Sequence, residues 1–155
     1  MANDKDEKKG FGPALAAMIL AIIAFVITGI VALVFSGLKD FVADVITEVI
    51  SSEFPEHSAI PAEELNAALD ILKLTFKLAF GAIHFSGGLF MLISFICDIV
   101  AICKYYGNKT ETKAASTIVL AYIGLAFLVA AVVIAVMGIN SISGMIDQLI
   151  APYYA

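Results

Sequence analysis

The stretch that decides the fold is AASTIVLAYIGLAFLVAAVVIAVMGINSISGMI, which occupies residues 114–146 and contains no Asp, Glu, Lys or Arg. A helix needs about 20 apolar residues to cross the hydrocarbon core of a bilayer. Two further charge-free stretches reach that length, at residues 10–38 and 78–97. The sequence therefore predicts three membrane-spanning helices.

The composition supports an integral membrane protein. Apolar residues make up 61% of the 155 residues and charged residues 15%, whereas soluble domains average about 45–50% and about 25%. A chain of this size has too little interior to hide so much apolar surface from water. It is also too hydrophobic to be intrinsically disordered. We therefore expect the lipid bilayer to be its main partner.

Charge and motifs exclude several classes of function. The formal net charge is −5 and all nine basic residues are lysine, so a nucleic-acid partner is not expected. The sequence contains no Walker A loop, no dinucleotide-binding glycine motif, no zinc-protease motif and no nucleophile elbow. Cys97 and Cys103 are six residues apart and form no redox motif. We expect no enzyme activity, no cofactor and no metal site.

The periodicity predicts an all-α membrane protein with three long helices, over residues 13–52, 61–106 and 111–150. At 1.5 Å per residue each is about 60–70 Å long, about twice the thickness of the hydrocarbon core. The first is interpreted as a retained signal anchor rather than a signal peptide, because its apolar run is too long. Residues 1–11 form a charged tail, and residues 12–155 form a single transmembrane domain.

Amphipathic extensions follow the apolar runs, at about residues 39–77 and 140–150. The simplest packing is an up-down-up bundle that extends beyond the outer membrane face, and the alternative is that the extensions lie flat on the membrane. A fourth span over residues 65–85 is rejected because it would place three charges near lipid. Gly87-Gly88 is expected to kink the second helix or to allow a neighbouring helix to approach closely.

The lysines predict the orientation, since cytoplasmic loops carry an excess of positive charge. Lysines lie in the N-terminal tail and between the second and third spans, whereas the connection between the first two spans contains eight acids. The N-terminus is therefore expected to be cytosolic and the C-terminus extracytoplasmic. One observation points the other way, because Asn108-Lys109-Thr110 is an N-glycosylation sequon.

Asp98 and His84 are the candidates for an ion or proton site. Asp98 is the only acid within an apolar run, and an acid in a membrane span is a functional candidate by default. The plainer alternative is that Asp98 meets water near the inner boundary, or accepts a hydrogen bond from Ser116, Thr117 or Tyr122. His84 is expected near the outer boundary, either as a pH sensor or as a side chain packed in the bundle.

Two weaker candidates lie outside the predicted spans. An acidic interaction tip is predicted around the turn between the first two helices. Its residues are Glu53, Glu56, His57, Glu63 and Glu64. His57 with Glu53 and Glu56 could bind a divalent ion, but a solvated tip is the preferred interpretation. Cys103 lies at the predicted inner edge and is a candidate for palmitoylation, but burial as a small apolar residue is the preferred interpretation for both cysteines.

Small residues recur every four positions on two of the predicted helices, a spacing that lets membrane helices approach closely. The pairs are Ala17 and Ala21, Ala24 and Thr28, Ala126 and Ala130, and Ala131 and Ala135. The sequence thus favours a non-enzymatic multi-pass membrane protein, acting as a structural, accessory or assembly subunit with a protein partner or as a homo-oligomer. The alternative is a small oligomeric channel or transporter that uses Asp98.

Overall fold

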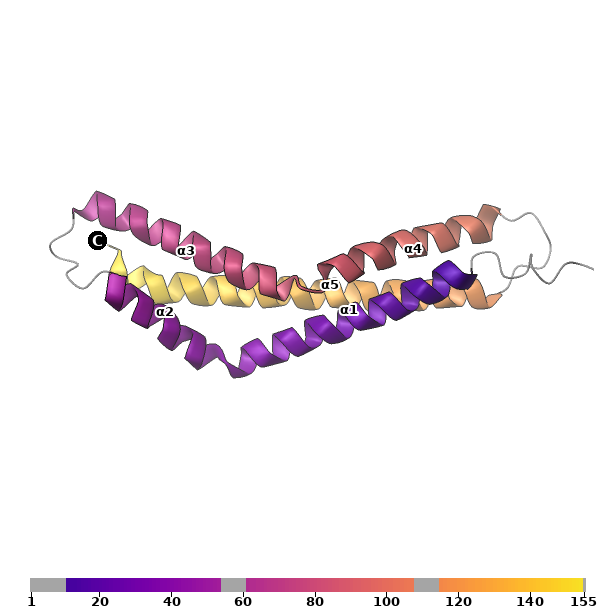
Figure 1. Ribbon diagram of the computed structural model, residues 1–155, viewed down its shortest axis with the longest axis horizontal. Coiled ribbons are helices and arrows are strands. Elements are labelled where there is room, and N and C mark those ends of the chain that lie inside the picture. The colour runs from indigo at the N-terminus through magenta and orange to yellow at the C-terminus, as the bar shows by residue number, and fades with distance from the viewer. Residues whose placement is uncertain (1–10, 54–60, 108–114, 155) are drawn as a thin grey trace, which may run out of the picture. The chain divides into compact units, whose positions relative to one another are not determined.

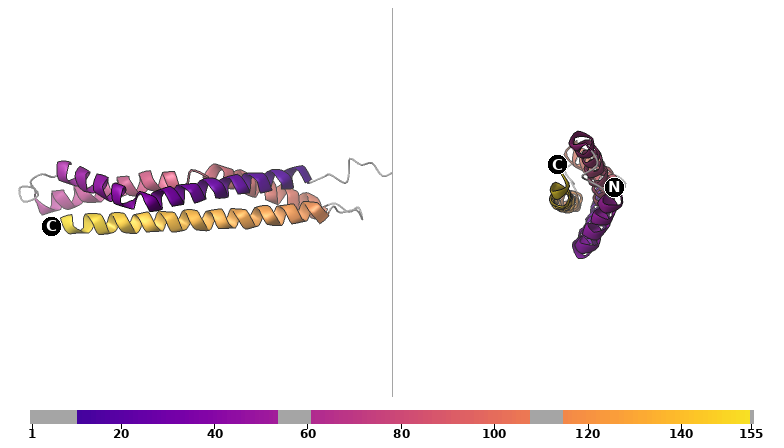
Figure 2. Two further views of the ribbon diagram at one scale, coloured as in Figure 1. Left: turned by 90° about the horizontal axis from the view of Figure 1, so that it is seen from below. Right: turned by 90° about the vertical axis from the view of Figure 1, so that its left-hand side faces the viewer.

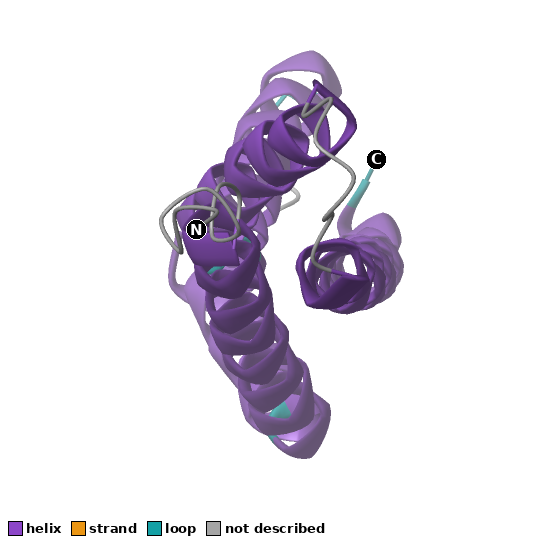
Figure 3. Ribbon diagram, turned by 90° about the vertical axis from the view of Figure 1, so that its right-hand side faces the viewer, coloured by secondary structure: helices purple, strands orange, loops and turns teal. Residues whose placement is uncertain are grey.

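The computed structural model describes residues 11–53, 61–107 and 115–154 of the chain. Its elements are α1 (Phe11–Gly37), α2 (Lys39–Glu53), α3 (Ala62–His84), α4 (Gly88–Gly107), α5 (Ala115–Ile150) and the short 3-10 helix η2 (Ala151–Tyr153) (Figure 1). No strand occurs within these described ranges (Figure 3). The predicted all-α fold is confirmed.

Three of the described helices are long and apolar enough to cross a membrane. They are Phe11–Gly37, Gly88–Gly107 and Ala115–Tyr153. The number of predicted spans is confirmed, and α3 is not among them, in agreement with the rejection of a fourth span. The second span begins at Gly88 rather than at Leu78, because residues 78–84 complete α3.

The first two predicted helices are each divided in two by a short break. Leu38 is a turn residue between α1 and α2, directly after Gly37. Residues 85–87 separate α3 from α4, and the backbone N–H of Phe85 donates to the carbonyls of Gly81 and Ile83. The third helix is uninterrupted, as predicted, and Figure 2 shows α5 as one continuous ribbon. A glycine lies at each break, Gly37 directly before Leu38 and Gly87 directly before α4, and glycine weakens a helix by about 1 kcal/mol relative to alanine.

The contacts divide the chain into two compact units. Unit 1 comprises the described residues of 11–30 and 86–134, and unit 2 those of 31–85 and 135–154. Unit 1 therefore contains most of α1, all of α4 and the first part of α5. Unit 2 contains the end of α1, both α2 and α3, and the last part of α5, and so includes the predicted amphipathic extensions.

Unit 1 has an interior of small side chains. The buried positions of α1 are Ala14, Ala17, Ala21, Ala24 and Thr28, and those of α5 in this unit include Thr117, Ala121, Leu128 and Ala131. On α1 they alternate by three and four residues, the spacing of a coiled-coil seam. Gly87 lies against α1, since a Cβ there would be 3.0 Å from Thr28 Oγ1 and 3.3 Å from the Ala24 carbonyl oxygen. The glycine pair therefore serves both predicted purposes, as a break and as a close approach.

Unit 2 has a core of branched aliphatic side chains. Its buried members are Val42, Ile46, Ile50, Leu65, Leu69, Ile142, Ile146 and Ile150. Aromatic rings close one side, and Phe35 packs edge-on against Phe80 at 5.6 Å between ring centroids. The predicted apolar face of α5 packs against this core, and so do Val42, Ile46 and Ile50 of α2, whereas Phe41, which the periodicity also places on that face of α2, is 63% exposed. On α3 the predicted apolar face packs against the core as far as Phe80. Beyond that point the prediction is wrong, because Ile83 is 45% exposed and His84 is buried in its place.

Candidate functional site

Asp98 lies in the middle of α4, ten residues after Gly88 and nine before Gly107. Its side chain is 1% exposed and faces the other two helices of unit 1. A Cβ on Gly124 of α5 would be 3.2 Å from Asp98 Oδ1 and 3.1 Å from the backbone nitrogen of Met18 of α1. Asp98 therefore sits at a close approach of α1, α4 and α5, in the middle of α4 rather than near its end.

Neither carboxyl oxygen of Asp98 has a hydrogen-bond partner within the described part of the chain. Polar side chains of the same unit form hydrogen bonds with other groups. Ser94, one turn away on α4, donates to the Ala17 carbonyl at 2.9 Å. Tyr122 hydrogen-bonds to Tyr106. The expected hydrogen bond from Ser116, Thr117 or Tyr122 to Asp98 is therefore wrong.

His84 ends α3 in unit 2 and is 2% exposed. Its Nδ1 lies 3.1 Å from the Phe80 carbonyl oxygen, and its ring centroid is 4.5 Å from that of Phe35. The opposite side of the ring meets Gly138 of α5, where a Cβ would be 2.3 Å from His84 Cδ2. This geometry supports the interpretation of His84 as a packed side chain of the bundle.

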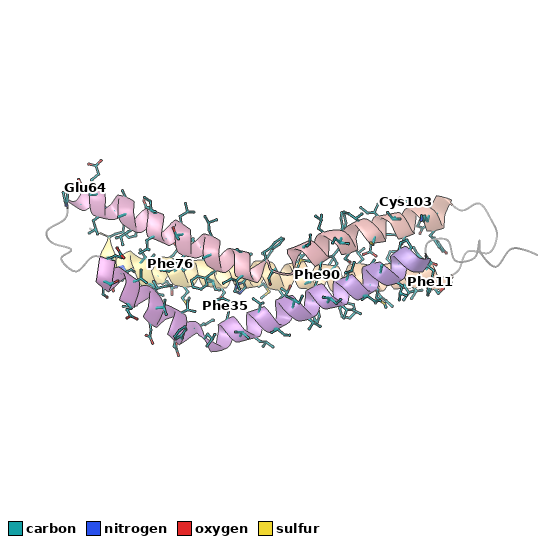
Figure 4. The ribbon with its side chains drawn as sticks, viewed as in Figure 1. Phe11, Phe35, Glu64, Phe76, Phe90 and Cys103 are labelled. Carbon is teal, nitrogen blue, oxygen red and sulfur yellow. The ribbon has the colours of Figure 1, made fainter. Side chains whose placement is uncertain are left out.

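The predicted acidic tip is only partly described. Glu53 is exposed at the end of α2, and Glu63 and Glu64 are exposed in the first turn of α3, where carboxylates suit the positive end of the helix dipole. Figure 4 shows Glu64 pointing away from the neighbouring helices. Glu56 and His57 lie outside the described residues. Within the described ranges no three His, Cys, Asp or Glu residues gather in a group that could hold a metal ion.

The two cysteines are free thiols, and neither is fully buried by the chain itself. Cys97 is half-buried, and Cys103 is exposed near the C-terminal end of α4 (Figure 4). The preferred interpretation, that both are buried as small apolar residues, is therefore wrong within the chain itself. Palmitoylation of Cys103 stays a prediction, and the exposed thiol is accessible for it.

The small-residue pairs divide into two kinds. Those on α1 and the pair Ala131 and Ala135 are buried by neighbouring helices. In contrast, Ala126 is exposed and Ala130 half-buried. Together with Phe25 and Phe127 they line an open apolar crevice in unit 1, beside an edge-on contact of the two rings at 5.4 Å.

An ion-pair cluster in unit 2 was not predicted from the sequence. Asp147 of α5 lies 2.7 Å from Lys73 Nζ and 2.8 Å from Lys77 Nζ of α3. Next to it, the Tyr154 hydroxyl donates to Asp70 Oδ1. The sequence does contain an indication of this cluster, because Asp147 is the only charged residue of α5. Lys73 and Lys77 are one turn apart, which places them on one face of α3.

The cluster changes the proton affinity of its members. The hydrogen bond with Asp147 raises the pKa of Lys73 above its ordinary value of 10.5. The hydrogen bond with Asp70 raises the pKa of Tyr154 above its ordinary value of 10.0. In both cases the folded chain holds the proton more tightly than the unfolded chain. The stability that this provides is present below the ordinary pKa and is lost as the pH rises through the raised value.

We expect this cluster to make the chain sensitive to alkaline pH. The thermal unfolding midpoint of the wild type, followed by circular dichroism in a mild detergent, should be constant up to about pH 10 and fall above it. Asp147→Asn should start lower and fall less, because the neutral amide no longer favours the lysine proton. The effect should be small and should shrink in high salt, since these side chains are solvent-accessible. Asp44→Asn, at an exposed position of α2, is the matched control. Identical pH profiles for wild type and Asp147→Asn would contradict the assignment.

These features define the class of the protein as an all-helical chain with three candidate membrane-spanning helices, one of which carries a buried acid without a hydrogen-bond partner among the described residues. Comparison with protein-family models, with curated proteins and with solved structures finds no match. The function is therefore inferred from the geometry of this chain alone.

Proposed function

We propose that this chain is a non-enzymatic multi-pass membrane protein that acts as a structural, accessory or assembly subunit of a membrane complex. The observation that carries the proposal is where the apolar and polar side chains lie. Large apolar side chains remain exposed on the three candidate spans, for example Leu33 at 75%, Leu89 at 65% and Met137 at 66%. Such surfaces require lipid or partner helices.

The arrangement of polar groups supports the same proposal. Catalysis needs a nucleophile or base within reach of a substrate. In unit 1 the hydroxyls of Thr28 and Ser94 are buried and donate to backbone carbonyls. The crevice beside Phe127 is lined by aromatic rings and alanines only. These groups are suited to holding helices together rather than to chemistry on a substrate.

The proposal includes an orientation and a set of contacts. The N-terminus is cytosolic and the C-terminus extracytoplasmic, as the lysine distribution favours. The amphipathic extensions, at about residues 39–77 and 140–150, then project from the outer face, and exposed acids such as Glu53, Glu63 and Glu64 are available for a partner with positive charge. The partner is another membrane protein or a further copy of the chain.

A second candidate function is favoured by Asp98. A carboxyl in a membrane span is costly, and such residues commonly mark ion or proton sites. Here both of its oxygens are buried without a partner in the described structure. The second candidate is therefore a small oligomeric channel or transporter that uses Asp98 as an ion or proton site.

One set of preparations separates the two candidates. The full chain is purified natively in a mild detergent, its mass is measured, and it is then reconstituted into liposomes for proton and cation flux. The accessory role predicts a discrete complex with other chains or copies, and no flux from the chain alone. A solitary monomer would overturn it. Flux that is present in the wild type and absent in Asp98→Asn, with Asp147→Asn as control, would establish the second candidate instead.

A further inference from the structure

The buried carboxyl of Asp98 occupies a site without room for a large ligand. At Gly124 even a single added carbon would be 3.2 Å from Asp98 Oδ1. The Met18 backbone closes the same point from α1, with its Cα 3.2 Å from that added carbon. The side chain of Asp98 is therefore enclosed by α1, α4 and α5.

Within the described residues of unit 1, no positively charged group lies next to Asp98 to stabilise its ionised carboxylate. The described residues 11–30 of α1 contain no titratable side chain, and residues 115–134 of α5 contain only Tyr122, which is bonded to Tyr106. On α4 the titratable neighbours are Cys97, Cys103, Lys104, Tyr105 and Tyr106. The nearest of these with a positive charge, Lys104, is six residues away and so about 9 Å along the helix. A buried carboxylate without a paired charge or hydrogen-bond donor is strongly disfavoured.

We propose that Asp98 is a proton-binding site at the contact of α1, α4 and α5, and that this contact closes on the protonated carboxyl and opens when the proton leaves. A neutral carboxyl fits a dry contact far better than a carboxylate does. Opening admits water to the charged form and so removes the cost of its burial. Binding and release of one proton are thereby linked to the packing of unit 1.

A proton suits this site better than a metal ion does. Metal ions such as Ca²⁺ and Mg²⁺ take six or more oxygen ligands, including water. Asp98 belongs to no group of three ligating side chains in the described structure. The buried hydroxyl of Ser94, one turn away on α4, donates its proton to the Ala17 carbonyl.

This inference concerns the same carboxyl as the second candidate function, but it does not depend on flux or on the accessory role. A chain that neither transports ions nor joins a complex can still open on loss of a proton. The experiment therefore measures the proton and the helix contact directly, and failure of either functional proposal leaves it intact.

The first measurement detects the proton. The full chain, with its aspartates labelled with 13C at the carboxyl, is placed in lipid nanodiscs and its infrared spectrum is recorded at neutral pH. We expect the carbonyl band of a protonated carboxyl in the wild type and in the control Asp147→Asn. The band should be lost in Asp98→Asn. Absence of such a band from the wild type would overturn the proposal without reference to any variant.

The second measurement detects the opening. In a Cys103→Ser background the half-buried Cys97 is the only thiol, and it lies beside Asp98. Its labelling rate is measured against pH in the wild type and in Asp98→Asn, so that the ratio of the two rates cancels the thiol's own titration. Once the open state releases its proton, the ratio should rise by about tenfold per pH unit. The asparagine variant should stay closed, because the amide imitates the protonated acid in size and charge.

Three other results of these measurements would contradict the proposed proton site. A ratio that does not change with pH would show that the proton is not linked to the contact. Failure of Asp98→Asn to fold would show that the neutral form does not fit. Slower labelling in sodium or potassium chloride than in choline chloride, lost in Asp98→Asn, would show that a metal cation occupies the site in place of the proton.

Discussion

Gly138→Ala is expected to destabilise unit 2 by about 2–3 kcal/mol, at the upper end of the usual cost of overpacking. The added Cβ would lie 2.3 Å from Cδ2 and 2.9 Å from Nε2 of His84. The ring cannot turn away easily. It is 2% exposed, packs against Phe35, and holds its Nδ1 on the Phe80 carbonyl. Either the ring or α5 must move, and both movements disturb the aromatic side of the core.

Thermal unfolding by circular dichroism measures the loss, and hydrogen exchange of peptides from α3 and the end of α5 locates it. The matched control is Gly144→Ala, six residues further along α5, where nothing lies within 4 Å of an added Cβ. His84→Ala made together with Gly138→Ala should restore much of the loss, so the two changes should not be additive. Equal stability of the Gly138 and Gly144 variants would contradict the packing described here.

The second large effect is expected at Gly124, in unit 1. A Cβ there would be 3.1 Å from the backbone nitrogen and 3.2 Å from the Cα of Met18. Backbone atoms of a helix cannot give way as the end of a flexible side chain can. Gly124→Ala should therefore push α1 away from α5 and cost about 1–3 kcal/mol, and Gly124→Leu should cost more.

Labelling of Cys97 in the Cys103→Ser background reports this separation, because the thiol is half-buried in unit 1. Faster labelling and a lower unfolding midpoint are expected for both Gly124 variants. Gly29→Ala is the control, since its added Cβ would meet nothing within 4 Å. If alanine at Gly124 left both measurements unchanged, the close approach of α1 and α5 would be refuted.

The sequence predicts the helices better than it predicts their interruptions. Charge-free length identifies the spans because lipid permits few charges, and periodicity identifies the stripe of Val42, Ile46 and Ile50 because a core selects one helix face. The breaks depend on local backbone geometry. Near Gly37 and Gly87 the apolar pattern continues without a change that marks the end of a helix. For that reason the sequence predicts a second span that begins at Leu78, whereas the helix begins at Gly88.

The candidate site shows the same limit more clearly. Asp98 is recognisable from sequence because an acid within an apolar run is unusual. Its lack of a hydrogen-bond partner cannot be recognised from the sequence. The predicted helices place Ser116, Thr117 and Tyr122 at about the same level as Asp98, so each could bond to it. Their actual directions depend on the rotation of α5 about its axis. The pairing of Asp147 with Lys73 and Lys77 depends likewise on the register between α3 and α5, which cannot be predicted from a single sequence.

The alanine seam of unit 1 has a consequence for how this chain can vary. At Ala14, Ala17, Ala21 and Ala24 the neighbouring helices leave each side chain fully buried. What these positions require is small volume, and glycine or serine meets that requirement nearly as well as alanine. The outward positions require only an apolar side chain, which many residues supply. Two chains with this architecture can therefore differ at almost every position and still share small residues at the same alternating spacing of three and four.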